Sequence, residues 1–185
     1  MTKPNLTTEQ RAQNIKLLSL DVDGVFTDGR VYLSGQGEDL KCFNILDGLG
    51  VKLLQASGVD VAIISGRQSE PLALRAKALG IKHFYPGRED KLNALSELLA
   101  KTGLEPDQVA HLGDDLPDLP VMLNVGLAMA VTNAYPLVKE KAHWQSTKKG
   151  GEGAVREACD FIMQSQGTLT SSHQHYLTQR LPGQH

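Results

Sequence analysis

The chain has 185 residues, a length that suits one domain with its own core and is short for two complete domains. Hydrophobic residues make up 41% of the chain, charged residues make up 22%, and the net charge is -2. This balance excludes a disordered chain and argues against a nucleic-acid binder held by phosphate contacts. The first 14 residues are polar, and no apolar run approaches the roughly 18 residues of a membrane-spanning helix, so we expect a cytoplasmic protein. Cys42 and Cys159 lack the spacing of a metal site, and we expect both to be buried.

Short apolar runs, which are typical of buried strands, alternate with longer amphipathic segments. The predicted strands cover residues 16–22, 59–64, 81–85, 109–112 and 126–131. The predicted helices cover residues 46–57, 68–79, 91–101, 116–124 and 154–164. This alternation predicts an α/β fold, a Rossmann-like parallel sheet with helices on both faces.

One segment breaks the alternation. Residues 30–33 and 39–43 read as two short strands around Ser34-Gly35-Gln36-Gly37, which predicts a β-hairpin flap over residues 29–43. We expect residues 15–166 to form the domain, after a polar extension over residues 1–14. The Ser-, Thr-, Gln- and His-rich tail over residues 167–185 has no apolar period, and we expect it to be mobile.

An acidic motif, Asp21-Val22-Asp23-Gly24, stands where the first predicted strand ends. In open α/β sheets ligands bind at the carboxyl ends of the strands. Past the strand end, Gly24 relaxes the backbone, so that Asp21 and Asp23 can both turn toward one ligand. A solvated acidic turn is the alternative, but this motif directly after an apolar strand is not a typical turn sequence.

A second acidic turn, Gly113-Asp114-Asp115, follows the strand at 109–112, and Asp118 comes soon after it. Asp114 or Asp115 could simply cap the next helix. If the two strands are neighbours, however, several carboxylates converge in one crevice, and a cation must offset their repulsion. Hard oxygen ligands at an open site indicate Mg²⁺.

Between the two acidic turns, the ends of the predicted strands and helices carry groups that suit a phosphoryl ligand. Ser65-Gly66-Arg67 closes the strand at 59–64, and Lys91 begins a helix. A hydroxyl, backbone N–H groups and a lysine can stabilise the charge on phosphoryl oxygens. Taken singly, Lys91 is more often a solvated helix residue and Ser65 a strand-end cap.

The order of these motifs resembles the haloacid dehalogenase superfamily of phosphotransferases over residues 16–166. The phrases DVDGVFTDG, FNILDGLG, ISGR, GDDLPDLPVM and KKGGEGAVRE, with a hairpin in place of a cap domain, are similar to its capless sugar-acid phosphatases. The resemblance implies Mg²⁺-dependent hydrolysis of 3-deoxy-D-manno-octulosonate 8-phosphate to the free sugar acid and phosphate, through an aspartyl-phosphate, in lipopolysaccharide precursor synthesis.

The resemblance also implies catalytic roles. Asp21 would be the nucleophile, and Asp23 the general acid and then the base that activates water. The carboxylates of Asp21 and Asp114 and the backbone carbonyl of Asp23 would hold the metal. Ser65 and Lys91 would hold the phosphate. Asp115 and Asp118 would support the metal's waters.

Substrate contacts implied by the resemblance are partly cationic, as suits a sugar that carries a carboxylate and a phosphate. They are Asp23, Asn44, Ile45, Leu46, Asp47, Gly48, Lys52, Gly66, Arg67, Arg75 and Lys91. Arg75 could equally be an exposed helix charge. Leu46 stands where the family phrase has arginine, and Lys52 stands where some members have it. A lysine cannot copy a bidentate guanidinium contact, so both departures bear on substrate identity.

Family members form tetramers in which flap strands pair across subunits and one subunit covers its neighbour's site. An isolated two-stranded hairpin is marginal, which favours a homotetramer here over a flap on a monomer. Three alternatives remain open for the function: a phosphatase for a nine-carbon sialic-type 9-phosphate, a phosphorelay receiver and a non-catalytic oligomer. A receiver would place its acceptor aspartate on a later strand than its acidic pair.

Overall fold

The computed structural model describes residues 6–35 and 37–178. Six strands form one parallel sheet in the order β5-β4-β1-β6-β7-β8, and β2 and β3 form a separate antiparallel pair. The main strands are β1 Leu17–Leu20, β4 Asp60–Ile64, β5 His83–Tyr85, β6 Val109–Gly113, β7 Leu127–Ala130 and β8 Trp144–Gln145. The helices are α1 Thr8–Gln13, α2 Ile45–Ala56, α3 Glu70–Ala78, α4 Lys91–Thr102, α5 Leu119–Met122, α6 Pro136–Lys141, α7 Ala154–Ser165 and α8 Leu169–Thr178, with short 3-10 turns η1 Pro106–Gln108 and η2 Leu116–Asp118.

Strand β1 lies in the middle of the sheet and is buried along its whole length. It pairs with β4 on one side and with β6 on the other, and Leu20 lies beside Leu112 of β6. Because both strands run in the same direction and in this register, their carboxyl ends reach the same edge of the sheet. The acidic turns that follow them therefore meet there, as the sequence predicts.

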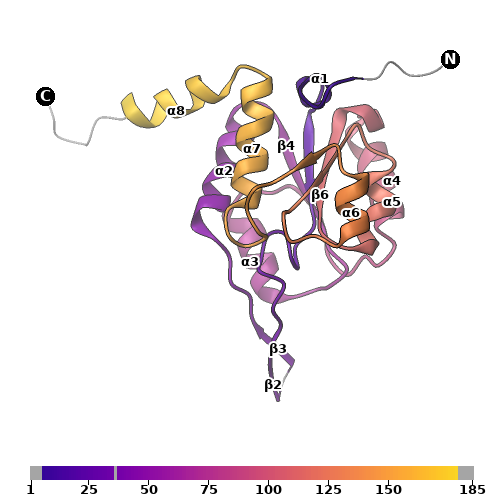
Figure 1. Ribbon diagram of the computed structural model, residues 1–185. Helices are drawn as coiled ribbons and strands as arrows, with labels where there is room; N and C mark the ends of the chain where they lie inside the picture. Colours follow the sequence, from indigo (N-terminus) through magenta and orange to yellow (C-terminus); the bar gives the residue numbers. More distant parts are fainter. Residues whose placement is uncertain (1–5, 36, 179–185) are drawn as a thin grey trace, which may run out of the picture.

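Helices cover both faces of the sheet (Figure 1). On one face, Leu18 and Leu20 belong to the core that α2, α3 and α7 also line. On the other face, Leu17 and Val109 pack with the apolar side of α4. Successive strand residues point to opposite faces, so Ser19 and Asp21 share the α4 face with Leu17.

The flap consists of β2 Tyr32–Ser34 and β3 Gly37–Leu40. It extends away from the main sheet (Figure 1), and the residues of β2 are exposed. The predicted hairpin is present, with its strand boundaries one to three residues from the expected positions. The expected turn includes Gln36, which lies outside the described residues.

The predicted parallel sheet and two helical layers are confirmed, and most boundaries lie within two residues of expectation. The predicted helix over residues 116–124 is shorter, because η2 occupies its first turn and α5 ends at Met122. Pro120 lacks the backbone N–H that a continuous helix from residue 116 would bond to the Leu116 carbonyl. Asp115 caps η2 by accepting a hydrogen bond from the Leu116 N–H at 2.8 Å.

Among the described residues, the sequence patterns do not predict α1, η1, α6, β8 or α8. Helix α1 begins with a capping box between Thr7 and Gln10, buries Ala12, and packs against α7. Helix α8 occupies part of the tail that we expected to be mobile. That mobility stays a prediction, and residues 1–5 and 179–185 lie outside the described part of the chain.

The cysteines differ from each other. Cys159 is buried in α7, as predicted, and burial raises the pKa of its thiol. The prediction is wrong for Cys42, which is exposed, because it lies on the segment that links the flap to α2. Among the described residues, no helix is both long and apolar enough to cross a membrane.

Candidate active site

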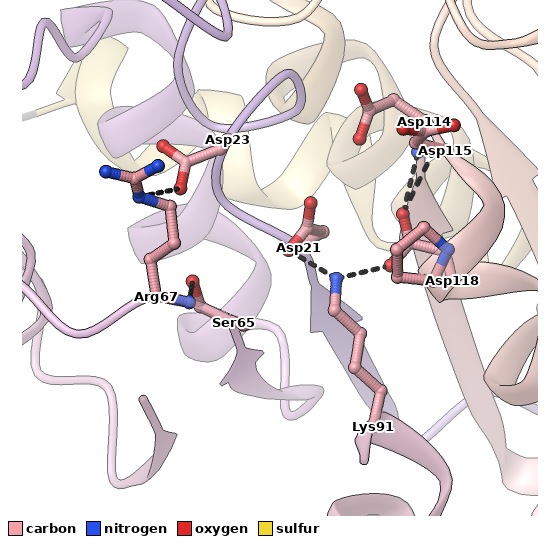
Figure 2. A pocket seen from close by; sticks show the side chains of 10 residues that line it. Asp21, Asp23, Ser65, Arg67, Lys91, Asp114, Asp115 and Asp118 are labelled. Carbon is pink, nitrogen blue, oxygen red and sulfur yellow. Dashed lines mark hydrogen bonds and ion pairs between the residues drawn. The ribbon is translucent and has the colours of Figure 1, made fainter. Parts of the chain in front are cut away.

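Asp21 lies just past the end of β1, where its N–H still bonds to the Leu112 carbonyl at 3.1 Å. The residue is 6% exposed. Its Oδ1 accepts a hydrogen bond from Lys91 Nζ at 2.6 Å (Figure 2). The central strand thus carries a nearly buried carboxylate to the sheet edge, with a cation beside it.

Lys91 is the first residue of α4 and is also nearly buried. Its Nζ contacts Asp118 Oδ1 at 2.7 Å as well as Asp21 (Figure 2). Burial alone would lower the pKa of Lys91, but the charges of Asp21 and Asp118 outweigh it and raise that pKa. The side chain is therefore a fixed ammonium ion between two carboxylates, rather than a solvated helix residue.

Asp118, in η2, uses both of its oxygens. Oδ1 accepts hydrogen bonds from Lys91 and from His111 Nε2, the latter at 3.1 Å. Oδ2 accepts from the N–H groups of Asp114 at 3.0 Å and Asp115 at 3.3 Å. Burial alone would raise the pKa of Asp118, but the bonds and charges of His111 and Lys91 hold it well below its usual range. Asp118 is thus an ionised carboxylate that ties the second acidic turn to Lys91.

Three carboxylates gather at this edge. One oxygen each of Asp21, Asp114 and Asp118 lies within 4.8 Å of the others. Burial, followed by the charge of Asp118, raises the pKa of Asp21 to about 6. Burial, followed by the charge of Asp21, raises the pKa of Asp114 to about 8. A divalent cation would relieve this repulsion, and hard carboxylate oxygens suit Mg²⁺, so the donor set fits the predicted metal.

Gly24 makes the close approach of the two turns possible. Its φ is +97°, and a Cβ at this position would lie 2.1 Å from Asp114 Oδ2. A side chain here would be strained and would also displace the Asp114 carboxylate. Gly24 of the first acidic motif therefore leaves room for the Asp114 carboxylate of the second motif.

Asp23 faces a different set of partners. Its side chain is 21% exposed, and Oδ1 accepts a hydrogen bond from Lys41 Nζ at 2.5 Å. Arg67 Nε lies 3.9 Å from Oδ2 (Figure 2). The Lys41 side chain is only 2% exposed and follows β3, so it connects the flap to Asp23. Lys41 was not predicted, because a lysine after a hairpin strand carries no signal that distinguishes it from a solvated one.

Ser65 stands after β4 and is 1% exposed. Its Oγ accepts a hydrogen bond from the Arg67 N–H at 3.3 Å. It lines the same cavity as Asp21, a hollow of about 190 Å³. The residues around this cavity are Asp21, Asp23, Ser65, Gly66, Arg67, Lys91, Asp114, Asp115, Pro117 and Asp118. The predicted catalytic and metal-binding residues are therefore brought together.

The predicted sugar contacts at the start of α2 are not among the residues that line this cavity. Asn44 caps α2 by accepting from the Leu46 N–H at 2.8 Å. Asp47 is buried, which raises its pKa, and its Oδ1 accepts from the Arg156 N–H of α7 at 2.8 Å. Ile45 and Leu46 are 81% and 53% exposed. Within one chain, Asn44 and Asp47 thus stabilise the packing of α2, and their substrate contacts stay predictions.

Arg75 and Lys52 also lie away from the cavity. Arg75 Nη2 donates to the Asn44 carbonyl at 3.2 Å, and its guanidinium lies over the Phe43 ring at 5.7 Å. A Cβ on Gly48 would come within 2.2 Å of that Nη2. Arg75 is therefore not an exposed helix charge but packs against the start of α2, and its substrate contact stays a prediction. Lys52 is exposed on α2, where it borders a groove with Tyr176 of α8.

An aspartate after the central strand, a second acidic turn on the neighbouring strand and a buried lysine between them define a haloacid dehalogenase-like hydrolase. The sequence profile described by that name matches residues 81–158. The 3-deoxy-D-manno-octulosonate 8-phosphate phosphatase of Yersinia pestis is 54% identical over 160 residues, which are 86% of this chain and 86% of that protein. The chain belongs to the 3-deoxy-D-manno-octulosonate 8-phosphate phosphatase family.

Solved structures agree. A probable YrbI family phosphatase from Pseudomonas syringae pv. phaseolica superimposes with a TM-score of 0.91 at 54% identity, covering 94% of this chain and 98% of that one. The 3-deoxy-D-manno-octulosonate 8-phosphate phosphatase of Moraxella catarrhalis, solved with magnesium, phosphate and the KDO molecule, gives a TM-score of 0.89 at 40% identity, covering 91% and 97%. The family prediction is confirmed, and membership of a phosphatase family decides against the receiver alternative.

Proposed function

We propose that this chain hydrolyses 3-deoxy-D-manno-octulosonate 8-phosphate to the free sugar acid and inorganic phosphate, a step in lipopolysaccharide precursor synthesis, with Mg²⁺ as cofactor. The observation that carries the proposal is the meeting of Asp21 and Asp114 on a cavity that Lys91 and Ser65 also line. Its relatives in Yersinia pestis and Moraxella catarrhalis bear the name of this activity.

In the first half-reaction, an oxygen of Asp21 attacks phosphorus and the bond from phosphorus to the sugar oxygen breaks, which leaves an aspartyl-phosphate. Burial raises the pKa of Asp21, and the Lys91 ammonium opposes that rise, which favours the ionised carboxylate that the attack requires. The Lys91 ammonium, 2.6 Å from Asp21 Oδ1, offsets negative charge on the phosphoryl oxygens. Ser65 adds a hydroxyl donor.

Asp23 would transfer a proton in each half-reaction. It protonates the departing sugar oxygen, then takes a proton from the water that attacks the aspartyl-phosphate, which releases phosphate and restores Asp21. Lys41 holds Asp23 Oδ1 at 2.5 Å and Arg67 Nε lies 3.9 Å from Oδ2, so two cations fix this carboxyl group at the cavity that it lines. The partial exposure of Asp23 suits the proton transfer, because water and product must reach it.

The carboxylates of Asp21 and Asp114 and the backbone carbonyl of Asp23 would hold Mg²⁺, which when bound supplies positive charge beside the nucleophile and the phosphoryl group. Both oxygens of Asp118 already accept hydrogen bonds. We therefore assign Asp118 to the support of Lys91 and of the second acidic turn, a role that differs from the expected support of the metal's waters.

A homotetramer with flap strands at the subunit interface completes the proposal. The cavity of about 190 Å³ is smaller than the ~300 Å³ at which sites for small molecules usually begin, so another surface has to cover the sugar. The flap exposes apolar side chains that suit such an interface: Val31 at 42%, Tyr32 at 42%, Leu33 at 72% and Leu40 at 53%. The cytoplasmic location stays a prediction.

The direct test compares phosphate release from the eight-carbon and nine-carbon sugar-acid phosphates by purified protein with Mg²⁺. We expect kcat/KM to favour the eight-carbon substrate and activity to disappear in excess EDTA. A preference for the nine-carbon substrate would replace the substrate assignment. Release of no phosphate from either ester would contradict the enzyme proposal itself.

A further inference from the structure

A chain of buried polar groups runs beneath the proposed nucleophile. Ser19 Oγ lies 2.9 Å from His111 Nδ1, and His111 Nε2 lies 3.1 Å from Asp118 Oδ1. Asp118 Oδ1 in turn contacts Lys91 Nζ, which contacts Asp21. Ser19 and His111 are fully buried and have no place in the mechanism above.

The sheet register brings these groups together. Ser19 of β1 and His111 of β6 are direct neighbours in the parallel pairing. Both lie in strands whose other residues are apolar, where an unpartnered polar group would be costly. Each ring nitrogen of His111 has a partner, so hydrogen bonds with Ser19 and Asp118 offset this cost.

Donor and acceptor chemistry makes the chain directional. An ionised carboxylate only accepts hydrogen bonds, so His111 Nε2 carries a proton toward Asp118. The Ser19 hydroxyl can either donate to Nδ1 or accept from it, so it keeps the ring in place in both cases. Ser19 thereby orients His111, and His111 orients Asp118.

We propose that His111 is a positioning residue for phosphoryl transfer, one that fixes Asp118 so that Lys91 stands against Asp21. The kinetic consequence of this inference rests on the proposed function. The ammonium group of Lys91 is attached through a flexible four-carbon chain, so the neighbouring anions determine its position. Backbone N–H groups hold Oδ2 of Asp118, and His111 holds Oδ1, the oxygen that Lys91 also contacts.

A matched pair of amide variants separates positioning from packing. In His111→Gln, the amide nitrogen can take the place of Nε2 and still donate to Asp118. In His111→Asn, the shorter amide can reach Ser19 but not Asp118. We expect His111→Gln to keep kcat/KM within about 3-fold of the unmodified protein, and His111→Asn to lose about 10-fold or more, the effect of one hydrogen bond to a charged group. The inhibition constant for inorganic phosphate should rise only in His111→Asn.

Equal activity of the two variants, whether both normal or both impaired, would overturn the inference, because the contact with Asp118 would then not matter. The melting temperature of each variant reports any loss of packing separately. If His111→Asn does not fold, His111→Phe, which keeps a ring but has no donor, takes its place in the comparison.

Crystal structures of the same variants test the inference without catalysis. Lys91 Nζ should leave Asp21 Oδ1 in His111→Asn and remain within hydrogen-bond distance in His111→Gln. A Lys91 that stays in place in His111→Asn contradicts the positioning role. Absence of phosphatase activity in the unmodified protein contradicts the proposed function instead, so the two failures are distinguishable.

Discussion

The sheet edge and the flap differ in nearly every physical respect. At the edge, Asp21, Lys91 and Asp118 are buried, charged and held by one another. The flap is a two-stranded hairpin that exposes Tyr32 and Leu33 and contacts the site through Lys41. The reactive groups are thus positioned within one chain, whereas the surface that would enclose the sugar is not. The predictions below test this division between the two regions.

Asp21→Asn should have the largest effect. An amide cannot accept the phosphoryl group, so we expect kcat to fall at least ~10⁴-fold, as for the loss of other catalytic nucleophiles. Steady-state phosphate release measures the change. Asp107→Asn, at an exposed position outside the cavity, is the matched control and should be fully active. Residual turnover of Asp21→Asn near the normal rate would refute the nucleophile assignment.

Lys91→Met should lower kcat/KM by about 10³-fold, because it removes a charge next to the nucleophile and the phosphoryl group. It also removes the buried cation that Asp21 and Asp118 share, and the loss of one partner of a buried ion pair typically costs ~3–5 kcal/mol of folding free energy. Kinetics and urea unfolding measure the two effects. Lys101→Met, at the exposed far end of α4, should change neither. Normal kcat/KM in Lys91→Met would remove the lysine from the mechanism.

The flap prediction concerns assembly. Leu33→Asp places a charge on an apolar side chain that is 72% exposed in one chain. In the proposed tetramer this charge would be buried, so we expect dissociation and a loss of about 10-fold or more in kcat/KM through a higher KM. Sedimentation velocity and kinetics measure both. Leu123→Asp, at a leucine that is 65% exposed and lies in the turn after α5, serves as control. If the Leu33→Asp protein forms an assembly of the same mass as the unmodified protein and has the same KM, the proposed interface is contradicted.

The smallest effect concerns pH. Asp114, with its pKa raised to about 8, is mostly protonated at pH 6 in the metal-free protein, and Mg²⁺ must displace that proton. Mg²⁺ affinity should therefore rise as the pH rises from 6 to 8, by up to about tenfold per pH unit. Calorimetry in buffers of different ionisation enthalpy should also detect proton release. An affinity that is independent of pH over this range would rule out Asp114 as a titrating ligand.

Much of the sheet edge could be predicted from the sequence, because its residues stand at positions that local patterns define. Asp21 and Asp114 each follow an apolar strand, and parallel strands bring such positions to one edge. Lys41 and His111 could not be assigned in this way. Their roles depend on contacts between segments distant in the chain, Lys41 with Asp23 and His111 with Ser19 and Asp118.

The predicted sugar contacts show a limit of reasoning from sequence patterns. Arg75 and Asp47 carry charges that suit a sugar-acid phosphate, yet in one chain they hold α2 against its neighbours. A charge in a motif indicates that a polar partner exists, but whether that partner is the ligand or the protein depends on packing. The positions of the catalytic aspartates could be predicted from the sequence, because each follows a strand and the ends of parallel strands meet at one edge of the sheet.

The most direct test of the central claim is a crystal structure of the protein with Mn²⁺ as the divalent ion and inorganic phosphate. We expect an anomalous peak between the carboxylates of Asp21 and Asp114, with the phosphate beside Lys91 and Ser65. A peak at another place, or a phosphate bound with no ion shared by those two aspartates, would contradict it.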